Sequence, residues 1–239
     1  MHSLGQTRSA RRDDHLLHTP DTFVRAAWPG MINAMAIVHV SPAIGAAFTQ
    51  YTAELATDGY LPATNVQRFV YVLSGEAHMA GASLGPGGFA YVPSGEAGAV
   101  QSATGARIAV IEKPYVALPG TSAPASFTGQ EADQPPQPLN GDADLEVRAL
   151  VPADAAFDFA VNTMAYRPGA ALPMVEVHVM EHGLLFLQGG GIYRLGDSWY
   201  PVTEGDFIYM APWCPQWFGA LGKVPAKYLI YKDWDRHPL

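Results

Sequence analysis

The stretch Glu176-Val-His-Val-Met-Glu-His182 brings a carboxylate and two imidazoles together within seven residues. On a helix, His178 and His182 would lie one turn apart, while Glu176 would point away from them. On a strand, alternate side chains share one face, so Glu176, His178 and His182 would lie together. The valines that alternate with them are β-branched, and Pro173 disfavours a helix just upstream. The stretch therefore predicts a strand whose even-numbered face presents three potential metal ligands.

Composition limits the class of protein. A hydrophobic content of 49% over 239 residues supports a real core, and 24 Gly with 20 Pro favours many turns and short strands. The net charge of −8, without a basic stripe, argues against a nucleic-acid partner. Apolar runs are too short to cross a membrane, and the start lacks the hydrophobic stretch of a signal peptide. The single cysteine, Cys214, suits packing in a reducing compartment. We therefore expect a cytoplasmic protein.

Two parts of the chain share one pattern. Residues 68–75 read Arg-Phe-Val-Tyr-Val-Leu-Ser-Gly and residues 182–189 read His-Gly-Leu-Leu-Phe-Leu-Gln-Gly; each is followed by Gly-x-Phe-x-Tyr and a proline-containing corner. The spacing of the copies is that of a duplicated domain rather than a solenoid. The following boundaries are predicted: an N-terminal tail at 1–20, a first domain at 21–117, a Pro- and Gly-rich linker at 118–142, and a second domain at 143–239.

Short apolar segments recur through both copies and indicate an all-β protein of double-sheet barrels. The predicted strands are Phe69–Leu73, Phe89–Val92, Ile108–Ile111, Phe157–Tyr166, Leu184–Leu187, Phe207–Met210 and Tyr228–Tyr231.

Two motifs of the second copy resemble those of the cupins. The first runs from Gly169 to Gly189 and contains the metal-ligand stretch; the second, Gly205-Asp-Phe-Ile-Tyr-Met-Ala-Pro-Trp-Cys-Pro-Gln216, ends in glutamine where cupins usually have histidine. The resemblance implies an all-β bicupin with two tandem jelly-roll (double-stranded β-helix) barrels. It also implies a metal at one barrel mouth, held by Glu176, His178, His182 and Gln216.

A finer resemblance is to the (S)-ureidoglycine aminohydrolase family, the manganese bicupins of allantoin and purine breakdown. It is carried by Glu176-x-His-x-x-x-His-Gly183, by Gly191-Ile-Tyr-Arg-Leu195, by Pro215-Gln-Trp217 and by the ending from Tyr228 to Leu239. It implies an anionic ureido substrate and a homo-oligomer.

The same resemblance implies that Tyr193, Tyr228 and Lys232 contact the substrate. Strand parity supports part of this, because Tyr228, Ile230 and Lys232 would share one face of a strand. From parity alone, Lys232 could equally be a side chain that reaches from the strand end to solvent.

The predicted ligands form a mixed nitrogen and oxygen set without thiolate. Such a set favours Mn²⁺ or Fe²⁺, although Ni²⁺, Cu²⁺ and Zn²⁺ compete on affinity, and the amide oxygen of Gln216 favours Mn²⁺. In the first copy the matching positions are occupied by residues that cannot form this set: Pro62, Thr64, Arg68 and Gly98. We therefore expect the N-terminal barrel to carry no metal.

The leading functional hypothesis is a Mn²⁺-dependent hydrolase that converts (S)-ureidoglycine to (S)-ureidoglycolate and ammonia. Glu176 would hold the metal and manage a proton at the substrate amine, and Lys232 would pair with a substrate oxygen or act as acid or base. Two other functions stay open. Two histidines and a carboxylate also form the site of non-haem Fe²⁺ dioxygenases, and a cupin can bind a small anion without catalysis.

Overall fold

The computed structural model describes residues 6–236 and divides the chain into two compact units. Unit 1 contains Pro136–Ala149 together with the described parts of Met1–Phe23 and Phe159–Leu239. Unit 2 contains Val24–Pro135 and Leu150–Asp158. Both units consist almost entirely of antiparallel strands, so the predicted all-β class is confirmed.

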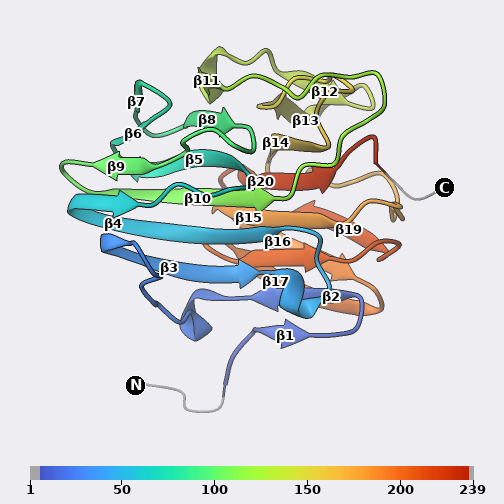
Figure 1. Cartoon of the computed structure of the whole chain (residues 1–239). Coiled ribbons are helices and arrows are strands. Elements are labelled where there is room, and N and C mark those ends of the chain that lie inside the picture. The colour runs from blue at the N-terminus through green and yellow to red at the C-terminus, as the bar shows by residue number, and fades with distance from the viewer. Residues whose placement is uncertain (1–5, 237–239) are drawn as a thin grey trace. The chain divides into compact units, whose positions relative to one another are not determined.

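Unit 1 has a large sheet in the order β1-β2-β18-β15-β20-β14-β13-β12 and a small sheet in the order β17-β16-β19. Figure 1 shows β14, β20 and β15 side by side within it. The strands are β1 (Ala10–Arg11), β2 (His15–His18), β12 (Gln137–Leu139), β13 (Asp142–Ala149), β14 (Phe159–Tyr166), β15 (His182–Gln188), β16 (Gly190–Leu195), β17 (Ser198–Thr203), β18 (Phe207–Met210), β19 (Gln216–Ala220) and β20 (Ala226–Asp233), with a short 3₁₀ helix η1 (Pro20–Thr22).

Unit 2 is built around one sheet in the order β11-β8-β5-β10-β4-β9-β6-β7, with β3 also paired to β4. The long strands β3, β4 and β10 run beside one another in Figure 1. The elements are β3 (Ile32–Val40), η2 (Pro42–Ile44), β4 (Thr49–Leu61), β5 (Gln67–Gly75), β6 (Ala77–Met79), β7 (Ala82–Leu84), β8 (Gly88–Val92), β9 (Val100–Ser102), β10 (Ala106–Lys113), β11 (Phe127–Gln130) and η3 (Glu131–Asp133).

The strands predicted from the sequence are present. Six of the seven predicted segments lie within observed strands, and the seventh begins two residues later than predicted, at Phe159. Their residues are buried because the central strands of each sheet are covered on both faces.

The unit boundaries differ from the predicted domain boundaries. The predicted tail at 1–20 contains β1 and β2, and β2 pairs with β18 of unit 1. The predicted linker at 118–142 is also structured: β11 pairs with β8 in unit 2, and β12 pairs with β13 in unit 1. Phe127 explains part of this difference, because its ring stacks on Tyr91 at a centroid distance of 5.4 Å. One partly buried aromatic ring, stacked on the buried Tyr91, thus anchors a segment whose overall composition is typical of a linker.

The two units differ in the chemistry of their cores. The core of unit 1 contains phenol rings from several strands, including Tyr166, Tyr193 and Tyr228. The core of unit 2 is mostly aliphatic, with residues such as Val70 and Ile108. Buried phenols usually need hydrogen-bond partners, and this core cluster of unit 1 holds three of them, whereas that of unit 2 holds Tyr51.

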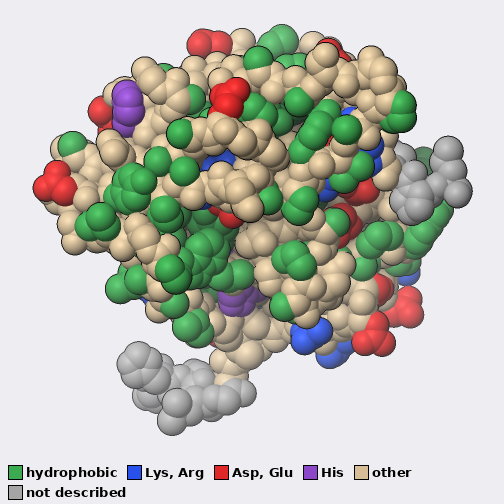
Figure 2. Space-filling view, in the orientation of Figure 1, with side chains coloured by type: hydrophobic (Ala, Val, Ile, Leu, Met, Phe, Trp, Pro, Cys, Tyr) green, Lys and Arg blue, Asp and Glu red, His purple; other side chains and the backbone are tan. Residues whose placement is uncertain are grey.

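No helix within residues 6–236 is long and apolar enough to cross a membrane. On the face drawn in Figure 2, the Lys and Arg side chains of the described residues lie in small, separate groups.

Candidate functional site

The segment before β15 is not the regular strand that the valine alternation predicts. Glu176 forms an isolated antiparallel bridge with Gln216, and the regular strand begins only at His182. The chain bends at residues 179–180. The predicted parity holds over the first part, where Val175 and Val177 are exposed and Glu176 and His178 are partly buried. The extended strand over 175–182 is therefore wrong, although its consequence for the side chains survives.

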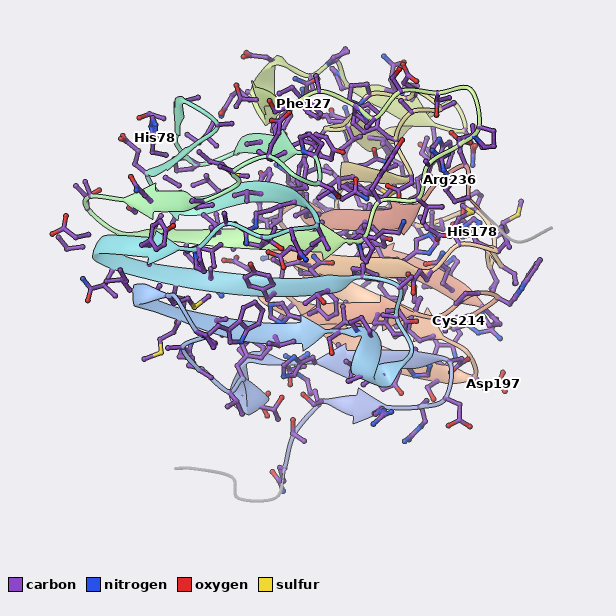
Figure 3. The ribbon with its side chains drawn as sticks, viewed as in Figure 1. His78, Phe127, His178, Asp197, Cys214 and Arg236 are labelled. Carbon is purple, nitrogen blue, oxygen red and sulfur yellow. The ribbon has the colours of Figure 1, made fainter. Side chains whose placement is uncertain are left out.

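The predicted ligand side chains lie next to one another. His178 Nε2 is 3.1 Å from Glu176 Oε2, and the rings of His178 and His182 stack at a centroid distance of 5.3 Å. Gln216 is joined to Glu176 by two backbone hydrogen bonds, of 2.8 and 2.9 Å. In Figure 3, His178 lies on a loop at the edge of unit 1, at the same end as Cys214. The bend at residues 179–180, the start of β15 and the start of β19 thus bring these side chains together.

His182 is held as a neutral imidazole. Its Nδ1 lies 3.1 Å from the carbonyl oxygen of Met180, so Nδ1 carries the proton and Nε2 keeps its lone pair. Burial, with the nearby His178 and Lys232, lowers the pKa of His182 to about 3. The nitrogen at Nε2 is therefore available to a metal ion at neutral pH without loss of a proton.

Gln216 offers an oriented amide oxygen. It is buried at the start of β19, and its Oε1 accepts a hydrogen bond of 3.0 Å from the hydroxyl of Tyr193. An amide oxygen has two lone pairs, so one lone pair stays free for a cation. Tyr193 is therefore linked to the site by its hydrogen bond to Gln216, a contact that the sequence alone does not reveal.

A lysine of strand β20 places a positive charge beside these predicted ligands. Lys232 lies directly opposite His182 in the β15–β20 register, and Tyr228 lies opposite Phe186 on the same face. Burial lowers the pKa of Lys232, while the nearby carboxylate of Glu176 acts in the opposite direction. Lys232 therefore faces the site rather than serving only as a solvent-reaching side chain at the strand end.

Sequence reasoning missed two neighbours of these residues. The Tyr166 hydroxyl is 2.7 Å from that of Tyr228, and the Lys232 ammonium lies 4.5 Å from the centre of the Trp234 ring. Tyr166 belongs to β14, whose register against β20 cannot be read from the sequence. The available signal for Trp234 was its position two residues after Lys232, because a cation and an aromatic ring attract each other when they are this close.

The buried phenols of the site remain protonated. Burial is the largest cause that raises the pKa of Tyr166, Tyr193 and Tyr228 above the ordinary value, and the charge of Glu176 raises all three further. Protonated phenols can donate hydrogen bonds to an oxygen anion.

The donor set fits a divalent cation that accepts nitrogen and oxygen ligands. Glu176 and His178 are partly exposed and can rotate, whereas His182 and Gln216 are buried and oriented. The donor atoms of the three ionisable ligands do not all lie within 4.8 Å of one another. Among residues 6–236, the set that does is Asp14, His15 and Cys214. Burial and Asp14 raise the pKa of the Cys214 thiol to about 12, so this second cluster holds a neutral thiol.

The matching region of unit 2 contains a guanidinium group. Arg68 is buried, donates hydrogen bonds to the carbonyl oxygens of Pro62 and Gly98, and pairs with Glu112 at 2.6 Å. Pro62 and Gly98 occupy the positions that correspond to Glu176 and Gln216. Arg68 and Glu112 are register partners, as His182 and Lys232 are in unit 1. The positive group thus comes from β5 in unit 2 and from β20 in unit 1.

The fold and this site define the class of protein as a cupin. The cupin domain family model matches residues 162–231, which include every predicted site residue except Lys232. The solved oxalate decarboxylase of Bacillus subtilis covers 98% of this chain and 81% of its own, with a TM-score of 0.71 at 13% identity. That likeness concerns the fold alone.

Closer relatives identify the family. "Probable (S)-ureidoglycine aminohydrolase" of Oryza sativa is 40% identical over 98% of this chain and 78% of its own. The solved structure of the putative glyoxylate-induced protein of Pseudomonas aeruginosa has a TM-score of 0.89 and 28% identity, covering 100% of this chain and 95% of its own. The chain belongs to the (S)-ureidoglycine aminohydrolase family, which is a family of enzymes.

Proposed function

We propose that this protein is a Mn²⁺-dependent hydrolase that converts (S)-ureidoglycine and water to (S)-ureidoglycolate and ammonia. Membership of the family supports the substrate. The single observation that carries the chemistry is the grouping of two imidazoles, a carboxylate, an amide oxygen and an ammonium group at one barrel. We propose that Glu176, His178, His182 and Gln216 hold the metal. When bound, the metal supplies Lewis-acid polarisation of the substrate or of water.

The side chains around the metal would bind and orient the substrate. One carboxylate on a divalent ion leaves a positive site, and Lys232 adds a further positive charge. An anionic substrate is therefore attracted even though the whole chain carries a net charge of −8. Lys232 pairs with the substrate carboxylate or ureido oxygen, and the hydroxyls of Tyr193 and Tyr228 orient it by hydrogen bonds.

The reaction breaks the bond between carbon and the amine and forms a bond between the same carbon and a water oxygen. The lone pair of the ureido nitrogen assists loss of ammonia. Glu176 would manage the proton at the departing amine, and Lys232 would be the second acid or base. Because burial lowers the pKa of Lys232, its proton is easier to release near neutral pH.

The test supplies ureidoglycine, generated fresh from allantoate, to the purified protein while ammonia and the chirality of the product are followed. We expect K232M and E176Q to lower kcat/KM by about 100-fold or more, with little loss of stability. The matched control is K227M, on the same strand but at a position of opposite parity. Full ammonia release by both site variants, or activity that survives exhaustive chelation, would contradict the proposal.

Two further expectations belong to the same proposal. Oxygen consumption that depends on Fe²⁺ would instead identify the alternative dioxygenase, and tight ligand binding without turnover would identify a non-catalytic cupin. We also propose one metal ion per chain, because Arg68 supplies a buried positive charge at the matching position of unit 2. The homo-oligomer remains a prediction.

A further inference from the structure

The N-terminal segment is joined to the turn that leads to Gln216. Strand β2 pairs with β18 up to the register pair of His15 and Met210. The pairing then continues by one more hydrogen bond, of 2.9 Å, from the Ala211 amide to the Asp14 carbonyl oxygen. Residues 211–215, which we call the ligand turn, connect this point to Gln216.

The carboxylate of Asp14 contacts three separate groups. One oxygen is 2.7 Å from Nδ1 of His15, and the carboxylate also lies close to the sulfur of Cys214. The other oxygen lies against Gly196, where a Cβ atom would be only 2.7 Å away. The Gly196 amide in turn donates a 2.8 Å hydrogen bond to the Pro215 carbonyl oxygen. Asp14 therefore contacts the ligand turn both directly and through Gly196.

The ligand turn also contacts the other metal-ligand segment. Trp213 has a φ of +67°, a left-handed conformation that is rare for a large side chain. Its amide donates a 2.6 Å hydrogen bond to the carbonyl oxygen of His178. The conformation of the ligand turn therefore affects the positions of both Gln216 and His178.

Asp14, His15 and Cys214 could alternatively be read as a second metal site, since their donor atoms lie close together. Hydrogen bonds favour a different reading. His15 uses Nδ1 toward Asp14 and Nε2 toward the Tyr200 hydroxyl, at 2.9 Å, so both of its ring nitrogens have partners. The thiol of Cys214 also has a partner, because it donates a hydrogen bond of 3.6 Å to the carbonyl oxygen of Pro215. Such a network holds its members in place without an ion.

We infer that Asp14 is a positioning residue that holds the ligand turn and thereby places Gln216 and His178 for metal binding. This inference rests on the proposed metal site. Residues that orient metal ligands through other groups typically change metal affinity by about 10- to 100-fold when they are removed. Because Asp14 acts through a turn, we expect the lower end of this range.

The experiment measures the Mn²⁺ dissociation constant from the EPR signal of free Mn²⁺ during titration of the metal-depleted full chain. D14A is expected to raise the constant about tenfold. D14N keeps an acceptor oxygen and is expected to restore most of the affinity. The matched control is D13A, at the exposed neighbouring position, which should behave as wild type. Unfolding of each metal-free variant, followed by circular dichroism, establishes that the proteins compared are folded.

A double-mutant cycle with Q216A separates this inference from the proposed metal site. If Asp14 acts through Gln216, the effects of D14A and Q216A on the dissociation constant will be less than additive. Additive effects, or wild-type affinity in D14A, would overturn the inference alone. Wild-type affinity in Q216A would remove Gln216 from the ligand set and overturn both. Two Mn²⁺ ions per chain, one of them lost in C214S, would assign the cluster to metal binding and overturn the positioning role.

If D14A does not fold, Cys214 tests the same contact. C214A removes the thiol that lies beside the Asp14 carboxylate and donates to the Pro215 carbonyl oxygen, and it is expected to raise the dissociation constant several-fold, whereas C214S keeps a donor and should restore affinity. Equal affinities for wild type, C214A and C214S would contradict the inference.

Discussion

His182 illustrates how a single residue can be prepared for a metal by its surroundings. A buried imidazole without an anionic partner is most stable when neutral, and the hydrogen bond to Met180 selects which nitrogen stays free. This arrangement has a cost in stability at low pH, because His182 resists protonation in the folded protein and accepts a proton in the unfolded chain.

This cost gives a pH prediction for the metal-free protein. The pKa of His182 is about 3 in the folded state against an ordinary value of 6.5, so the unfolded state binds more protons between these values. His182 therefore lowers the free energy of unfolding as the pH falls below 6.5, by about 1.4 kcal/mol per unit. The measurement is urea unfolding at pH 7.5, 5.5 and 4.5 in chelator, compared with H182Q. Parallel curves for wild type and H182Q would contradict the assigned cause.

At the scale of elements, the β1–β2 segment at the edge of the large sheet shows how a short segment is held in place. Asp206 is completely buried beside the N-terminal end of β18, and Arg8 binds it with two nitrogens, at 2.5 and 2.8 Å. Arg8 also donates to the carbonyl oxygen of Pro201. The pair attaches the segment before β1 to the β17–β18 connection.

Removal of Arg8 should therefore destabilise the protein. In R8A the carboxylate of Asp206 keeps the amide of Thr203 but loses its cation, so we expect the free energy of unfolding to fall by about 1–3 kcal/mol. The comparison is with R11A, an exposed arginine of β1, which should change stability by less than about 0.5 kcal/mol. Equal urea midpoints for R8A and R11A would contradict this role.

Elements with a strong local pattern were predictable, and elements defined by their partners were not. Leu184–Leu187 and Phe207–Met210 are continuous apolar runs, which are typical of strands buried on both faces. The β1–β2 segment is rich in charge and becomes a strand only because β18 offers an open edge. The bend at residues 179–180 was missed for a similar reason, since bridging to Gln216 overrides the local preference of the valines.

The same distinction applies to the candidate site: contacts set by nearby sequence were predictable, and contacts set by sheet register were not. Motif spacing and parity placed Glu176, His178, His182 and Lys232 together, because these depend on neighbours in the chain. Tyr166 and Asp14 lie far from the motifs in sequence, and only the sheet register brings them near. Long-range register of this kind has no local signal in a single sequence.

At the scale of the whole molecule, duplication has produced two barrels with opposite charge arrangements. In unit 2 the buried guanidinium of Arg68 donates to two carbonyl oxygens and pairs with Glu112, which also accepts from the Tyr51 hydroxyl. Because Arg68 carries a permanent positive charge, this barrel should not need a bound metal ion at the matching position. Stability of unit 2 should therefore depend on Arg68 and not on added metal.

Replacement of Arg68 tests this statement. R68M leaves the mostly buried Glu112 without its cation, so we expect the free energy of unfolding to fall by about 3–5 kcal/mol. The double variant R68M/E112Q removes the unpaired charge and should recover part of the loss. R107M, at a partly exposed arginine of β10, is the matched control with an expected change below about 1 kcal/mol. A wild-type urea midpoint for R68M would show that the network contributes little.

The pairing of β2 with β18 has a consequence during translation. Synthesis runs from the N-terminus, so residues 15–18 leave the ribosome long before their partners at 207–210. Until then β2 has no β18 to pair with. A C-terminal half made without β2 would in turn leave the edge of β18 open to pair with other nascent chains. A gene cut between the halves would therefore yield a C-terminal product prone to aggregation, and co-expression of both pieces would be the natural rescue.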